Sequence, residues 1–169
     1  MAGKPHAGAA ASGLARKSRQ AARHVARIAA VQALYQMDLA HTDVTEVIAQ
    51  FLAHRFNRSG GEGTLETPAD KEFFSDVLRG VVRRQLEIDP MLDQQLAEGW
   101  RLFRIDSILR AILRSGAFEL MERTDVPARA VISQYIEVAH AFFSEEEPKV
   151  VNGVLDKLAR QLRAGEFTQ

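Results

Sequence analysis

Apolar residues recur at steps of three and four along almost the whole patterned part of the chain, from residue 18 to residue 162. The alternation of polar and β-branched residues that marks a strand is absent from the sequence. The pattern predicts seven helical segments, over residues 18–40, 42–56, 69–89, 91–98, 105–123, 127–143 and from 148 onward. The predicted fold class is therefore all-α, a compact bundle of about seven helices.

Local signals set the expected ends of these helices. Thr42 suits an N-cap, and residues 57–68 have the Gly, Ser and Asn content of a loop. Pro90 is expected to break or kink the third segment, because the residue before a proline avoids helical dihedrals. Pro127 is expected to be the first residue of its helix.

The last helix carries two residues that are locally unfavourable. It is expected to begin at Pro148, with Glu147 as an imperfect N-cap. Within it, Gly153 costs about 1 kcal/mol relative to alanine, and Asn152 would need a buried hydrogen-bond partner. Two such neighbours on an apolar helix predict that another helix packs closely against them.

Charge is distributed unevenly, although 22 Lys and Arg residues balance 22 Asp and Glu residues. Residues 1–37 carry no acid and six cations, which are Lys4, Arg16, Lys17, Arg19, Arg23 and Arg27. Residues 38–169 consequently have a net charge of −6. A basic end on an acidic body indicates an anionic partner for that end, with a disordered solubilising tail as the alternative.

The arginines of the first helix form a stripe. At about 100° per residue, they fall within an arc of roughly 80°; the stripe consists of Arg16, Arg19, Arg23 and Arg27. The same face becomes apolar further along, so the first half of the helix should project and the second half should be buried. A row of cations can contact several phosphates at once. Tyr35 is either a core residue or a platform on which a single-stranded base stacks.

The sequence holds no recognisable motif for catalysis or for a cofactor. It has no cysteine, which excludes disulfides and thiolate zinc sites. Glu137 and His140 have the spacing of half a di-iron site, but a second copy is missing. We expect no enzyme activity, no metal and no cofactor. The longest uncharged stretch of the patterned region is ten residues, too short to span a membrane, and we expect a cytoplasmic protein.

Three blocks of sequence carry a resemblance to a known family. They are ARHVARIAAVQALYQMD at residues 22–38, ILRSGAFEL at residues 112–120 with DVP at residues 125–127, and PKVVNGVLDKLAR at residues 148–160. In content, order and spacing these blocks resemble the NusB family of bacterial transcription antitermination factors. The chain departs from the family pattern at Val150, where a phenylalanine is usual, and in the helix after DVP, at Ser133, Gln134 and His140.

The resemblance implies an all-helical fold of two small bundles without catalytic activity. It implies binding of boxA, a short single-stranded element of nascent RNA, jointly with NusE, a small-subunit ribosomal protein. That complex joins the transcription elongation complex. The family's RNA-binding residues correspond here to Arg19, Arg23, Arg27, Tyr35 and Lys149. With the other cations of the first helix, the predicted RNA-binding residues are Arg16, Lys17, Arg19, Arg23, Arg27, Tyr35 and Lys149.

The expected organisation is a flexible extension over residues 1–15, a helical RNA-binding domain over residues 16–163 and a tail over residues 164–169. Two other hypotheses stay open. A homodimer that occludes its own basic end would be a protein-binding transcription regulator without specific RNA recognition. A similar helical domain also precedes some ribosomal RNA cytosine methyltransferases, but here no α/β cofactor domain or catalytic cysteine follows.

Overall fold

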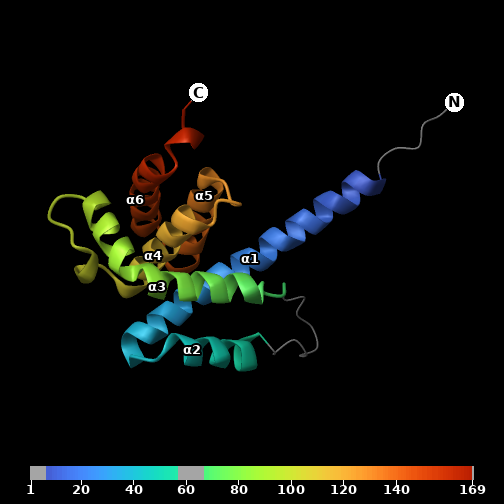
Figure 1. The fold of residues 1–169 in the computed structure, drawn as a ribbon, viewed down its shortest axis with the longest axis horizontal. Helices are drawn as coiled ribbons and strands as arrows, with labels where there is room; N and C mark the ends of the chain where they lie inside the picture. The colour runs from blue at the N-terminus through green and yellow to red at the C-terminus, as the bar shows by residue number, and fades with distance from the viewer. Residues whose placement is uncertain (1–6, 57–66, 169) are drawn as a thin grey trace.

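The computed structural model describes residues 7–56 and 67–168, and this part of the chain contains helices but no strand (Figure 1). The α-helices are α1 (Ala7–Ala40), α2 (Val44–Gln50), α3 (Lys71–Gln95), α4 (Ser107–Glu122), α5 (Ala128–Phe142) and α6 (Glu146–Leu162). Shorter turns are η1 (Phe51–Arg55, π-helical), η2 (Leu102–Arg104) and η3 (Ala164–Glu166). The prediction of an all-α fold is confirmed. Lys4 and most of the predicted loop 57–68 lie outside the described residues.

The described chain has six α-helices rather than about seven, because α3 continues through Pro90. The residues on either side of the proline, Ile88 and Leu92, are fully buried and hold both parts of the helix against the core. The carbonyl deprived of its partner by Pro90 belongs to Leu86, whose side chain is 93% exposed, so water can reach this turn. The predicted break at Pro90 and the separate helix over residues 91–98 are therefore wrong.

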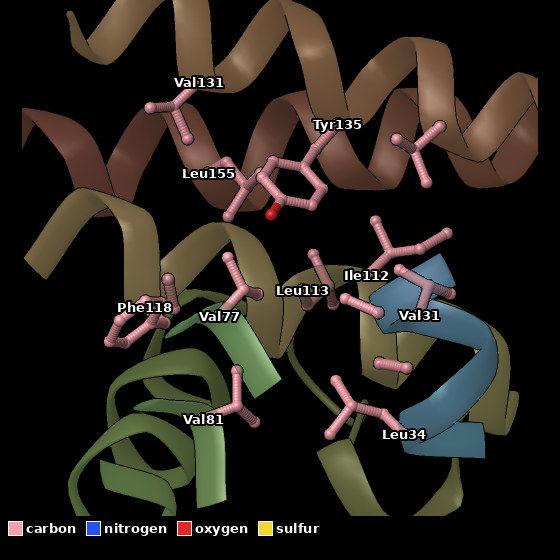
Figure 2. Close-up of a cluster of buried hydrophobic side chains, with 14 of the residues drawn as sticks. Val31, Leu34, Val77, Val81, Ile112, Leu113, Phe118, Val131, Tyr135 and Leu155 are labelled. Atoms are coloured by element: carbon pink, nitrogen blue, oxygen red, sulfur yellow. The ribbon is translucent and has the colours of Figure 1, made fainter. Parts of the chain in front are cut away.

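Helix α4 is the centre of the bundle and packs against α1, α3, α5 and α6. Nearly all of its residues from Leu109 to Leu120 are buried. Figure 2 shows side chains of α4 and of the four helices packed against it converging on one core, among them Val31, Val77, Ile112, Tyr135 and Leu155. No helix in the described part of the chain is both long and apolar enough to cross a membrane.

Helix α1 changes from exposed to buried along its length. Residues 8–20 are all exposed, whereas most residues from Ala26 to Leu34 are buried in the core. Figure 1 shows the N-terminal half of α1 projecting from the bundle, as the arginine stripe predicted. The helix begins at Ala7 instead of near Ser18, so residues 7–15, expected within a flexible extension, are helical.

The starts of α2, α5 and α6 also differ from the predicted ones. The N-cap of α2 is Asp43 rather than Thr42, because the Asp43 carboxylate accepts a hydrogen bond from the Thr45 amide. Pro127 is the N-cap of α5 rather than its first residue. Helix α6 begins at Glu146, so Pro148 is its third residue, a position whose amide has no partner within a helix in any case.

Close helix packing occurs at other glycines than the predicted one. Asn152 and Gly153 are both exposed, and a Cβ added at Gly153 would meet no atom within 4 Å. The predicted packing crossing at these residues is wrong. A Cβ at Gly80 of α3 would instead collide with the Phe118 ring, and one at Gly116 of α4 would lie 2.6 Å from the side chain of Leu155.

These glycines give a matched pair of predictions. Gly153→Ala should raise the free energy of unfolding by about 0.5–1 kcal/mol, because alanine favours the helix and finds open space. Gly80→Ala should lower it, since the Phe118 ring must move out of its place in the core. Chemical denaturation followed by circular dichroism measures both. Equal effects of the two substitutions would contradict the packing described here.

Candidate nucleic-acid interface

A cleft of about 410 Å³ lies between the projecting half of α1 and the beginning of α5. Its α1 side carries the four arginines of the stripe and Gln20. Its other side is formed by the turn between α4 and α5 and by two residues of α5; these are Asp125, Val126, Pro127, Ala130 and Gln134. We call this the arginine cleft. It brings together four of the predicted RNA-binding residues: Arg16, Arg19, Arg23 and Arg27.

The turn on the far side of the cleft is held in place by a buried arginine. Arg163, 8% exposed, donates hydrogen bonds to the carbonyl oxygens of Glu119, Leu120 and Arg123 at 2.8–2.9 Å. It donates a further one to the carbonyl of Val126, within the turn itself. Five donors in a planar fork let one side chain satisfy these carbonyls at the end of α4. The residues just after it, expected to form a tail, join this end of the bundle: Glu166 accepts a hydrogen bond from the Ala128 amide.

Arg27 lies at the buried end of the stripe and is 3% exposed. Its Nε and Nη2 donate to the two carboxylate oxygens of Glu119, at 2.8 and 2.9 Å. The Tyr135 hydroxyl donates to the same carboxylate. Burial favours the neutral form of the guanidinium, but the hydrogen bonds and charge of Glu119 outweigh it and raise the pKa of Arg27. Burial, with the charge of Glu119, also raises the pKa of Tyr135 well above its usual value, so this hydroxyl stays protonated.

The Nε and Nη2 groups of Arg27 are therefore engaged within the protein, and an RNA contact by Arg27 stays a prediction. Glu119 occupies Nε and Nη2, and Phe73 covers one face of the guanidinium, whose carbon lies 4.8 Å from the ring centroid. Its contribution is to fix the α1 backbone against α4 and α5.

Arg23 is intermediate between buried and free. Its side chain is 31% exposed and stacks on Phe73, with the guanidinium carbon 4.7 Å from the ring centroid. It lies 3.5 Å from the Asp125 carboxylate and 3.7 Å from the Asp70 carboxylate. A phosphate that binds Arg23 must therefore compete with these carboxylates.

Arg16, Lys17 and Arg19 carry the free charge of the helix. All three are exposed, and none forms an ion pair with another residue in the ranges 7–56 and 67–168. Because an unpaired exposed cation has no carboxylate to give up, these groups can accept an anion at the lowest cost. The stripe thus grades from free cations at Arg16 and Arg19, through the shared Arg23, to the sequestered Arg27.

Asp125 is the acidic counterpart inside the cleft. Its carboxylate lies 3.0 Å from Arg123 and 3.5 Å from Arg23. Burial opposes ionisation, but the charge and hydrogen bond of Arg123 outweigh it, and the pKa of Asp125 is lowered. The group is therefore ionised at neutral pH and occupies a position where a phosphate could otherwise meet Arg23.

Tyr35 and Lys149 lie outside the cleft. Tyr35 is 36% exposed, so it lies at the surface rather than in the core. At about 1.5 Å per residue it stands roughly 24 Å along α1 from Arg19. Lys149 is exposed, lies 3.5 Å from Glu146, and lines a separate hollow with His140 and Asn152. The structure thus unites the arginines but brings neither Tyr35 nor Lys149 to them.

Several surface features of the structure were not predicted from the sequence. Asp125 belongs to the DVP block and Gln134 to the helix after it, but no periodicity places either residue opposite α1. Trp100 and Phe103, 49% and 69% exposed, lie near a second hollow of about 430 Å³, which Trp100 lines together with Arg101, Arg104 and Val150. Exposed aromatic residues of this kind are frequent in protein interfaces.

The buried pair generates a prediction about stability. Arg27→Ala should lower the free energy of unfolding by about 3–5 kcal/mol, because it leaves the carboxylate of Glu119 buried without a partner. Arg16→Ala, which removes an exposed arginine of the same helix, should change it by less than about 0.5 kcal/mol. Urea denaturation of both variants measures the difference. Equal stability of the two would show that the Arg27–Glu119 pair does not anchor α1.

Comparison of the chain with known proteins gives one family. A sequence profile of the NusB family matches residues 24–160. The transcription antitermination protein NusB of Nitrobacter hamburgensis is 52% identical over 147 residues, which cover 87% of this chain and 91% of the relative. The protein of the same name from Allorhizobium ampelinum is 52% identical over 142 residues, or 83% of this chain and 88% of the relative.

Solved structures have the same fold. T. maritima NusB is 26% identical and superposes with a TM-score of 0.71, covering 86% of this chain and 96% of that protein. A chain from the crystal structure of the antitermination factors NusB and NusE in complex with dsRNA is 24% identical. It superposes with a TM-score of 0.68 over 82% of this chain and 96% of that chain. At this identity the second likeness concerns the fold alone.

Proposed function

The chain belongs to the NusB family, and we propose that it is a transcription antitermination factor that binds boxA-type single-stranded RNA together with NusE. In this function it joins a transcription elongation complex in the cytoplasm and supports transcription of ribosomal RNA operons. It acts by binding, without chemistry of its own. Support comes from the relatives named above and from the arginine cleft.

The observation that carries the proposal is a set of cations on the projecting end of α1 that form no ion pair with any described residue. Arg16, Lys17 and Arg19 are all exposed on α1, and Arg16 and Arg19 line the arginine cleft, while residues 38–169 have a net negative charge. Three phosphates held in this way would release counterions and make binding strongly salt-dependent. The acidic body disfavours phosphates elsewhere, which directs RNA to this end.

Tyr35 supplies the proposed stacking platform for a base further along the RNA. It is exposed and lies on the same helix, but roughly 24 Å from Arg19, so only a longer RNA that also passes this part of the protein contacts it. Aromatic stacking accepts any base, and it therefore contributes affinity more than specificity. Lys149, in its separate hollow, would be reached only by RNA that continues beyond the cleft. Arg27 contributes by holding α1 in place rather than by contact.

NusE is proposed to bind a surface apart from the arginine cleft. The surface around Trp100 and Phe103 has the exposed aromatic side chains of a protein contact, with Arg101 and Arg104 among them. A partner there would add its own RNA contacts to those of the cleft and so raise the affinity of the complex.

Fluorescence anisotropy of a labelled boxA-type RNA, over a salt series and with or without NusE, tests the proposal. A scrambled RNA of equal length is the control. We expect preference for boxA, steep salt dependence and tighter binding with NusE. Equal weak binding to both RNAs, unchanged by NusE, would overturn it. Light scattering would then ask whether the chain is the homodimeric, protein-binding regulator.

The same assay gives a prediction for single arginines. Arg16→Ala and Arg19→Ala should each weaken binding to all RNAs and reduce the slope of log affinity against log salt by about 0.7, the value for one lost phosphate contact on a single strand. Arg160→Ala, which removes an exposed arginine on α6, should leave the slope unchanged. If Arg160→Ala changed the slope as much as the others, phosphate binding would not be localised to α1.

Asp125 generates a prediction of the opposite sign. Asp125→Asn removes the carboxylate that competes for Arg23, and RNA affinity should rise by about two- to fivefold. Asp76→Asn is the matched control, because Asp76 pairs with Arg123 but does not line the cleft. Unchanged or weaker RNA binding by Asp125→Asn, with the fold intact, would mean that Arg23 does not receive a phosphate.

A further inference from the structure

Gln134 of α5 has an unsatisfied polar atom within the arginine cleft. Its side chain lines the cleft, and its amide oxygen is buried without a hydrogen-bond partner among the described residues. Leaving a buried acceptor unpaired costs about 1–3 kcal/mol, and such atoms are rare in folded proteins. No other buried, unpartnered side-chain atom of the described chain belongs to a residue of this cleft.

The surroundings of Gln134 suit a flat molecule with a polar edge. Val126, Pro127 and Ala130 line the same side of the cleft and offer apolar contact. The volume of about 410 Å³ falls within the range of small-ligand sites. A nucleobase combines an apolar face with a row of donors and acceptors at its edge, and single-stranded RNA can turn such a base out of the stack.

Two carboxamides line the cleft, those of Gln20 and Gln134, and of these only Gln134 has a buried oxygen without a partner among the described residues. The arginines are donors alone, and the carboxylate of Asp125 is already engaged by Arg23 and Arg123. A carboxamide presents a donor and an acceptor side by side, as the edge of a base does.

We propose that the arginine cleft receives one unstacked RNA base, whose edge is read by the Gln134 carboxamide while Arg16 and Arg19 hold the neighbouring phosphates. This inference rests on the proposed RNA-binding function and adds a position of base specificity to it. Gln134 is thus a specificity-determining residue, distinct from the arginines that supply affinity.

An abasic scan tests the inference. A boxA-type RNA is made in versions that each lack one base but keep the whole backbone, and each is titrated against wild type and Gln134→Leu. Wild type should lose about tenfold in affinity at one position, and Gln134→Leu should be insensitive to the loss of that base. The salt slope should be the same for both proteins, since no phosphate contact is removed.

Gln94→Leu, the same change at an exposed glutamine of α3, should keep the wild-type profile. If Gln134→Leu does not fold, as judged by circular dichroism, Gln134→Glu replaces it, because glutamate keeps the shape of the side chain but lacks the amide donor. Gln134→Glu should likewise be insensitive to the loss of that base. Sensitivity that persists in the variant, or tight binding by wild type with no sensitive base, would overturn the base pocket and leave the proposed function intact. Absence of RNA binding by wild type would overturn both.

Discussion

The buried ion pair between Arg27 and Glu119 is the interaction on which the candidate interface depends. It joins residues 92 positions apart in the sequence, and the Tyr135 hydroxyl adds a third helix to the same carboxylate. Ion pairs with 3% and 0% exposure carry a large desolvation cost, which bidentate geometry and full hydrogen bonding offset. The Arg27–Glu119 pair matters here because it sets both the rotation and the depth of α1 where the helix enters the core.

One consequence is that the arginines of α1 divide into those that anchor the helix in the core and those that are available to bind RNA. Arg27 is buried in its ion pair with Glu119, and Arg23 lines the cleft while it contacts two carboxylates. Arg16 and Arg19 are exposed at the rim of the cleft. The facing wall is fixed separately, by Arg163 and its bonds to carbonyls at the end of α4. Both walls of the arginine cleft are therefore tied to α4, the most buried helix, and an RNA strand would meet a preorganised surface with little ordering cost.

The sequence was sufficient for the fold class and for the polarity of α1, because both follow from local periodicity and charge. Prediction from the sequence failed for features that depend on contacts between residues far apart in the chain. Pro90 stays within α3 since the core holds Ile88 and Leu92, and Gly80 matters since Phe118 packs against it. Arg27 belongs to the same stripe as Arg19, and only the position of Glu119 separates their roles. Likewise, no pattern within α5 shows that Gln134 faces the arginines of α1.

The most direct test of the account is photo-crosslinking of a boxA-type RNA containing 4-thiouridine, with the crosslinked residues mapped by mass spectrometry. Crosslinks should fall on two stretches that are distant in sequence, residues 16–23 of α1 and residues 125–134 of the α4–α5 turn and α5. Their joint appearance would place the RNA in the arginine cleft. Crosslinks confined to α2, α3 or the C-terminal part of α6 would contradict the account, because RNA would then bind a surface that the Arg27–Glu119 pair does not shape.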